Sequence, residues 1–231
     1  MRFFLVLFLT LAAQGFTKDL FDTERTKKDA EQGDPIAQTA LGSYYKTGWG
    51  DVPKNPTKAF EWYKKAADQG YATAIARIGT CYEYGIGVPK NPRKAFECYE
   101  KAANISSHFF AQKDVARCYV KGIGVCPDGS KALEIYRRLA DGGEKDGLYY
   151  LGVCYYDGVG VPKDAVRAYA YFNASAAMDD DNAKEIRGVL EKEMTLGQIA
   201  EAQKLSKEIF EKFKDEQRQT EELIQKYSEK K

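Results

Sequence analysis

A short pattern of alanine, leucine, glycine and tyrosine recurs four times along this chain and constrains its fold more than any other feature. In the first copy the pattern reads Ala-x-x-x-Leu-Gly-x-x-Tyr, and the four copies begin at Ala37, Ala74, Ala111 and Gly147. The steps between copies are 37, 37 and 36 residues. Each copy continues with a Gly-x-Gly pair and then a basic residue followed by alanine. Self-similarity at a fixed period of this length is the signature of a stacked repeat array.

Each copy is predicted to form two helices separated by a turn. Apolar and small residues of the first copy recur from Ala37 to Gly48 at the spacing of one helical face. The Gly-x-Gly run then supplies positive-φ residues that end this helix, and a second apolar stripe begins at Ala59. Gly42 and Gly79 lie in mid-helix, where glycine costs about 1 kcal/mol relative to alanine, so we expect the paired helices to cross closely there. The prediction is an all-α fold, an α/α solenoid (superhelix) of about four stacked helix pairs with helical caps.

The full pattern, Ala-x-x-x-Leu-Gly-x-x-Tyr-x-x-Gly-x-Gly-Val followed by Lys-Ala-x-x-Trp-Tyr-x-Lys-Ala-Ala-x-x-Gly, resembles the Sel1-like repeat (SLR) family. These repeats are similar to tetratricopeptide repeats with longer loops. The resemblance covers roughly residues 20 to 215, and the third copy departs most from it, with Ala116 in place of the helix glycine. It implies an adaptor that holds protein partners together, in secreted and envelope settings of bacteria or in the endoplasmic reticulum of eukaryotes.

The segments of the chain follow from these landmarks. Residues 1–15 combine one basic residue, an apolar run and small residues near Gly15, which predicts a cleaved signal peptide; an uncleaved anchor is the alternative. Residues 18–33 end in a sequence that aligns with the end of the first copy, which predicts an N-terminal capping half repeat. The repeats are expected at 34–70, 71–107, 108–143 and 144–179, and capping helices and a tail at 180–231. No Pro/Ser-rich linker interrupts them, so we expect one domain.

The C-terminal segment is predicted to contain a long helix that begins at Leu196. Its apolar positions from Ile199 to Phe213 are expected to cover the last repeat. Beyond Phe213 apolar residues are too few for a core, so this part is expected to project from the fold. A coiled-coil partner site there is an open alternative.

Composition narrows the classes of partner. Lys and Arg number 35 against 34 Asp and Glu, a formal net charge of +1, so nothing favours nucleic acid or a charged membrane surface. No later stretch is apolar enough for membrane insertion after signal cleavage. We therefore expect an exported protein, periplasmic or secreted in a bacterium, and in the endoplasmic reticulum lumen or secreted in a eukaryote. No two-His or Cys-x-x-Cys pair is present for zinc, and no metal or cofactor is expected.

Five cysteines in an exported chain raise the question of disulfides. Cys81, Cys118 and Cys154 share one column of the repeat, and identical columns of stacked helix pairs lie on the order of 10 Å apart, beyond the ~7 Å limit for a bridge. The possible partners are therefore Cys98 and Cys126. The predicted bridge is Cys98 with Cys118, which leaves at least one thiol unpaired.

Two sequence fragments favour a rival function. Ser43 and Lys46 form Ser-x-x-Lys, and Lys46-Thr47-Gly48 reads Lys-Thr-Gly, both of which occur in serine β-lactamases. One lysine cannot fill both roles, because in the enzymes these motifs come from separate elements. A β-lactamase or cell-wall-type hydrolase, as associated with cysteine-rich members of the family, is kept as the alternative.

The preferred function is a non-catalytic scaffold for protein–protein interaction that binds a protein or peptide through its concave groove. By analogy with tetratricopeptide arrays, the groove is lined by first-helix columns, where a basic and an aromatic anchor would suit an acidic segment with an apolar side chain. The alternative is that this face is only solvated. The predicted partner-binding residues are Thr39, Ser43, Lys46, Thr80, Glu83, Lys113, Arg117, Tyr149 and Tyr156.

Overall fold

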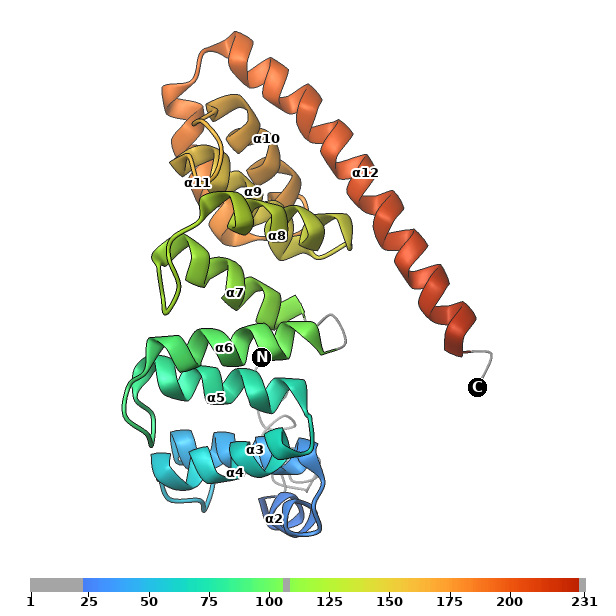
Figure 1. Ribbon diagram of the computed structural model, residues 1–231. Coiled ribbons are helices and arrows are strands. Elements are labelled where there is room, and N and C mark those ends of the chain that lie inside the picture. Colours follow the sequence, from blue (N-terminus) through green and yellow to red (C-terminus); the bar gives the residue numbers. More distant parts are fainter. Residues whose placement is uncertain (1–22, 106–108, 229–231) are drawn as a thin grey trace, which may run out of the picture. The chain divides into compact units, whose positions relative to one another are not determined.

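The computed structural model describes residues 23–105 and 109–228 of the chain. Every regular element in this part of the chain is an α-helix, and successive helices pack as pairs (Figure 1), which confirms the predicted all-α solenoid. The predicted signal peptide, residues 1–15, and the start of the predicted capping half repeat lie outside the described residues. The helices are α2 (Thr23–Glu31), α3 (Pro35–Thr47), α4 (Pro56–Asp68), α5 (Ala72–Tyr84), α6 (Pro92–Asn104), α7 (Phe109–Lys121), α8 (Gly129–Asp141), α9 (Lys145–Asp157), α10 (Ala165–Ala176), α11 (Asp181–Glu193) and α12 (Leu196–Ser228).

The chain divides into two compact units, Met1–His108 and Phe109–Lys231. The single domain expected from the absence of a linker stays a prediction. The division falls between the second and third repeats. A glycine with positive φ follows α2, α4 and α8; these are Gly33 (101°), Gly70 (80°) and Gly143 (80°). The aligned position between the second and third repeats is Ser107, which lies outside the described residues. The sequence also lacks this glycine after the fourth repeat, where Asp179 has φ of 61°.

The second helix of every repeat begins in the same way. The side chains of its N-cap residues accept hydrogen bonds from the backbone N–H three residues on, at 2.9–3.0 Å; the caps are Asn55, Asn91, Asp128 and Asp164. The residue that donates this bond is the basic residue of the repeat pattern. Its charged end lies over the tyrosine of the first helix, 5.1–5.5 Å from the ring centroid; the pairs are Lys58–Tyr45, Lys94–Tyr82, Lys131–Tyr119 and Arg167–Tyr155. The repeated basic residue therefore packs against the repeat that contains it.

The mid-helix glycines mark the closest approach of the two helices of a repeat. A Cβ on Gly42 would lie 2.7 Å from the ring of Tyr63, and a Cβ on Gly79 would lie 2.8 Å from the ring of Tyr99. Gly152 faces Phe172 in the same way, again at 2.8 Å. Carbon atoms in ordinary contact lie about 3.5–4.0 Å apart, so the close crossing predicted from the glycines is confirmed.

A second set of glycines brings neighbouring repeats of one unit together. In the first unit, Gly87 of the second repeat lies so close to Pro56 at the start of α4 that a Cβ would overlap the proline carbonyl. In the second unit, Gly160 lies against the backbone of Gly129 at the start of α8 in the same way. Both glycines have positive φ, 72° and 70°. Within each unit, the turn of one repeat is therefore set directly against the second helix of the preceding repeat.

Two further helices close the second unit (Figure 1). Helix α11 packs on α10 and occupies the place of another first helix, with Ala183 and Gly188 each 36 residues after their counterparts in α9. Helix α12 packs along α10 and reaches α8, with Ala202 and Phe213 buried, as its apolar stripe predicted. The Gln217 side chain donates to the backbone carbonyl of Gly143 at 3.2 Å, so α12 stays attached one turn beyond the expected point. No helix in the described residues has both the length and the apolar content to span a bilayer.

Candidate functional site

The predicted partner-binding residues of the first repeat lie on α3 and are tied to their own fold. Thr39 is buried, and its hydroxyl donates to the carbonyl of Pro35 at 2.8 Å. The Ser43 hydroxyl lies 3.1 Å from that of Tyr63, which comes from α4. Lys46, one turn further on, is half-buried. The first-repeat column therefore exposes little of its polar side chains.

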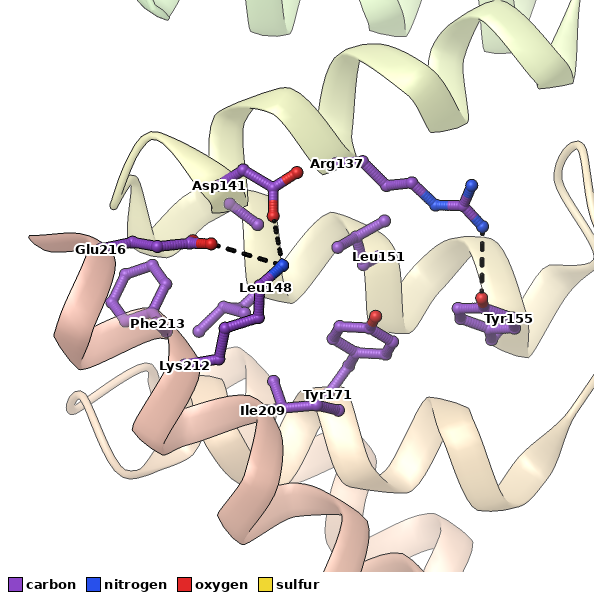
Figure 2. A pocket seen from close by; sticks show the side chains of 11 residues that line it. Arg137, Asp141, Leu148, Leu151, Tyr155, Tyr171, Ile209, Lys212, Phe213 and Glu216 are labelled. Carbon is purple, nitrogen blue, oxygen red and sulfur yellow. Dashed lines mark hydrogen bonds and ion pairs between the residues drawn. The ribbon is translucent and has the colours of Figure 1, made fainter.

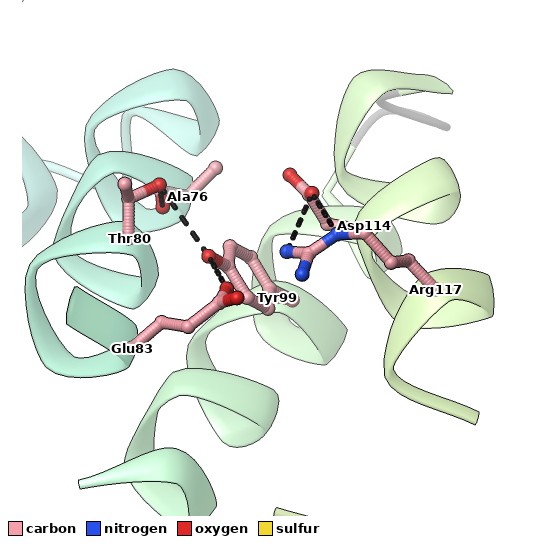
Figure 3. Close-up of polar contacts among 6 residues, drawn as sticks. All are labelled: Ala76, Thr80, Glu83, Tyr99, Asp114 and Arg117. Carbon is pink, nitrogen blue, oxygen red and sulfur yellow. Dashed lines mark hydrogen bonds and ion pairs between the residues drawn. The ribbon is translucent and has the colours of Figure 1, made fainter. Parts of the chain in front are cut away.

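The second repeat uses its column residues in a buried polar contact (Figure 3). The Tyr99 hydroxyl of α6 donates to the Glu83 carboxylate of α5 at 2.8 Å and lies 3.4 Å from the Thr80 hydroxyl. Glu83 is only 6% exposed, and Thr80 also donates to the carbonyl of Ala76 at 3.2 Å. Since a buried carboxylate needs hydrogen bonds, this contact stabilises the pairing of α5 and α6.

In the second unit, both predicted basic residues have carboxylate partners. Lys113 of α7 donates to Asp146 of α9 at 2.6 Å, and Arg117 pairs with Asp114 on its own helix at 3.1 Å (Figure 3). Burial, the largest single influence, would lower the pKa of Lys113, but the hydrogen bond to Asp146 and the negative charge of that carboxylate together outweigh burial and raise the pKa. Each cation is therefore neutralised locally.

The aromatic residues of the same unit remain at the surface. Tyr149 and Tyr156 lie on α9 with Val153 between them on the same face, and we call the three residues the α9 aromatic column after its two tyrosines. The rings of Tyr149 and Tyr156 pack against Phe172 of α10, with centroids 5.8 Å and 6.5 Å apart. Tyr156 is 37% exposed, whereas Tyr149 is half-buried and its burial raises the pKa of its phenol. These rings combine a fixed position with exposed apolar area.

A cavity that the sequence analysis did not anticipate lies between α12 and the helices α8, α9 and α10 (Figure 2). We call it the α12 cavity; its volume is about 320 Å³. Its charged and aromatic lining residues are Arg137, Asp141, Tyr155, Tyr171, Lys212, Phe213 and Glu216. The apolar stripe of α12 was the only available signal, and the stripe does not show which earlier helices it covers.

The described residues contain no group of three or more His, Cys, Asp or Glu side chains placed to hold a metal ion. His108 lies outside the described residues.

Comparison with protein families gives a match over most of the repeat region. The family model described as Sel1 repeat matches residues 35–71, 72–106, 110–144 and 145–180. This chain belongs to the Sel1 repeat family. The four matched segments begin within two residues of the repeat starts expected from the sequence.

Solved Sel1 repeat structures are similar to the chain. The protein c5321, a protective antigen of uropathogenic Escherichia coli with an SLR fold, is 32% identical with a TM-score of 0.74 over 92% of this chain and 46% of that one. The chain thus spans less than half the length of c5321. A Sel1 repeat protein from Oxalobacter formigenes is 34% identical, with a TM-score of 0.61 over 71% of this chain and 67% of that one. No curated protein matches the chain.

A third structure shows the shared fold alone. It is a putative Sel1 repeat protein from Klebsiella pneumoniae, 22% identical with a TM-score of 0.54, over 86% of this chain and 99% of that one.

The two β-lactamase-like fragments lie within the first Sel1 repeat. Ser43 and Lys46 are on α3, and Gly48 is the C-cap of that helix, with φ of 79°. The Ser43 hydroxyl bonds to the carbonyl of Thr39 at 3.1 Å besides its contact with Tyr63. The fragments are therefore consecutive turns and the end of one helix, not elements that converge on a site.

Three of the five cysteines occupy equivalent positions in three Sel1 repeats. Cys81, Cys118 and Cys154 are buried, Cys98 is half-buried and Cys126 is exposed. Cys98 belongs to the first unit and Cys118 to the second, so the proposed bridge between them stays a prediction.

Proposed function

We propose that this Sel1 repeat chain is an exported, non-catalytic scaffold that binds a protein or peptide. Membership of a helical repeat family supports the scaffold, and the sequence of residues 1–15 supports export. The observation that carries the proposal is the α9 aromatic column, because rigid, partly exposed tyrosines are enriched at the centres of protein interfaces.

The second unit is the better candidate for this contact. Its tyrosines rest on Phe172, so little side-chain freedom is lost when a partner covers them. The column residues Thr39 and Glu83 of the first unit are buried and already hydrogen-bonded, so a partner would gain little from them. An apolar side chain of the partner is therefore expected against Tyr149 and Tyr156, beside the Lys113–Asp146 ion pair.

The test is capture of the partner from the envelope fraction of the native host by gentle cross-linking and mass spectrometry. Tyr156→Ala is expected to reduce the captured partner about tenfold or more, since truncation of a central interface residue costs roughly 2 kcal/mol. Ile36→Ala is the matched control, because Ile36 is an apolar first-helix residue that is 63% exposed. Equal capture by both variants, or a loss that follows a lower melting temperature, would contradict the proposal.

Export is tested on the same protein with a C-terminal tag. The exported form is expected to lack residues 1–15, and the intact mass of the purified protein measures this directly. A full-length mass in the exported fraction would favour the uncleaved anchor.

The rival hydrolase is tested with the chromogenic β-lactam nitrocefin. No turnover is expected, because the Ser43 hydroxyl is held by Tyr63 and by a backbone carbonyl of its own helix. Turnover that Ser43→Ala abolishes would establish the hydrolase instead.

A further inference from the structure

The α12 cavity has an apolar floor. Leu148 and Leu151 of α9 and Phe213 of α12 are each 2% exposed, and Ile209 and Tyr171 beside them are half-buried (Figure 2). At about 320 Å³ the cavity lies at the small end of the roughly 300–1,000 Å³ range of ligand sites. It has room for one compact apolar group. Because the floor is apolar, a bound apolar group would displace water that has few hydrogen bonds to the protein there.

At one end of the cavity the charged side chains pair with one another. The Lys212 ammonium of α12 donates to Asp141 of α8 at 2.9 Å and pairs with Glu216 at 3.3 Å. The hydrogen bond to Asp141 is the main reason that the pKa of Lys212 is raised. Two carboxylates surround one ammonium here, so this end disfavours a bound anion.

The opposite end presents positive charge (Figure 2). The Arg137 guanidinium donates to the Tyr155 hydroxyl at 3.5 Å, and no carboxylate of the described residues pairs with it. Arg167 donates to the same hydroxyl at 3.4 Å, but Arg167 already has Asp164 as a partner at 3.4 Å. Arg167 does not line the cavity, so Arg137 is the guanidinium that supplies positive charge at this end.

We propose that the α12 cavity binds a compact amphipathic carboxylate, whose apolar body lies on Leu148, Leu151 and Phe213 and whose carboxylate pairs with Arg137. A guanidinium can hold a carboxylate through two parallel hydrogen bonds, which fixes the orientation of the ligand. Repulsion from Asp141 and Glu216 favours the same orientation. This chemistry could come from a free aromatic or aliphatic acid or from the C-terminal residue of a peptide. The site is separate from the α9 aromatic column and does not depend on the proposed scaffold function.

The test is calorimetric titration of the purified protein with 3-phenylpropionate and with its neutral amide, 3-phenylpropanamide. The carboxylate is expected to bind about tenfold or more tightly than the amide, because charge-assisted hydrogen bonds contribute most to such contacts. Arg137→Gln is expected to remove this preference. Arg138→Gln is the matched control, because Arg138 is the next residue of α8, is exposed and does not line the cavity.

A second variant locates the apolar body. Ile209→Trp fills the cavity from the surface of α12 and is expected to abolish binding while the helical circular dichroism signal is retained. Binding that survives Ile209→Trp, equal binding of acid and amide, equal effects of the two arginine substitutions, or no binding of the acid would each overturn the proposal.

Two peptides distinguish the sources of the carboxylate. One ends in phenylalanine with a free carboxylate, and the other has the same sequence with an amidated C-terminus. Tighter binding of the free-carboxylate peptide than of 3-phenylpropionate assigns the cavity to peptide C-termini. Weaker binding assigns it to free acids.

Discussion

Replacing Gly79 by alanine adds one methyl group at the crossing of α5 and α6. The new carbon would lie 2.8 Å and 2.9 Å from two ring carbons of Tyr99 and 3.2 Å from the backbone oxygen of Ala95. The ring cannot simply turn aside, because its hydroxyl is bonded to the buried Glu83 carboxylate at 2.8 Å. Either the helices separate or this hydrogen bond lengthens.

Two destabilising effects and one stabilising effect set the size of the change in the free energy of unfolding. Overpacking of a close contact costs about 1–3 kcal/mol, and weakening a hydrogen bond to a charged group costs up to roughly 1.5–3 kcal/mol. The greater helix propensity of alanine returns about 1 kcal/mol. We therefore expect Gly79→Ala to lower the free energy of unfolding by about 1–3 kcal/mol.

Gly188→Ala provides the matched control, because Gly188 is also inside a helix and a Cβ there would meet nothing within 4 Å. That substitution is expected to stabilise the protein by about 0.5–1 kcal/mol. Urea unfolding followed by circular dichroism measures both changes, and hydrogen exchange in α5 and α6 locates the first. In a protein that already carries Tyr99→Leu, the ring is absent, so adding Gly79→Ala should lower the free energy of unfolding by less than it does in the parent protein. If Gly79→Ala is as stable as the parent protein, the reasoning about this crossing is refuted.

Two further predictions concern the repeated basic residue and the buried thiols. Lys94→Met removes the charge 5.4 Å from the Tyr82 ring centroid but keeps the aliphatic stem, so it should cost about 0.5–1 kcal/mol in urea unfolding; an equal change in Lys101→Met, an exposed position of α6, would contradict this. Burial raises the pKa of the Cys81 thiol from 9.0 to about 11 and that of Cys154 to about 12. The unfolded chain therefore loses these protons at lower pH than the folded one, so stability should fall as pH rises from about 9 toward 11. Melting temperatures over this range measure the fall, and a flat profile would count against thiol burial.

The helix pairs could be predicted because their signals are local. The spacing from Ala37 to Gly48, and the glycines that end each first helix, determine helix and turn within one copy. The reason for Gly42 and Gly79 was also visible, since glycine inside a helix is costly unless another chain segment comes close.

The surroundings of the site residues could not be predicted in the same way. Thr39 and Glu83 share a helical face with residues expected to be exposed, yet both are buried. The flanking glycine lets the second-helix tyrosine come so close that its hydroxyl reaches this face, as Tyr99 does with Glu83. Spacing along one helix does not show how far a side chain of another helix extends.

The α12 cavity was missed for a related reason. Its lining comes from four helices between Arg137 and Glu216, and no interval in the sequence relates them. The stripe of α12 predicted that the helix packs on the last repeat. It did not predict that Lys212 would reach back to Asp141 of the repeat before.

Neighbouring repeats touch through backbone at two points, where Gly87 meets Pro56 and Gly160 meets Gly129. These contacts are made by backbone atoms and not by the side chains that form the surface of the repeats. At these two points backbone meets backbone, so a side chain at either glycine would change the distance between the two repeats. Outward-facing residues can then change in evolution or by design without altering the pitch of the unit. A new specificity could then arise from surface residues alone, whereas the loss of either glycine would change how two repeats are stacked.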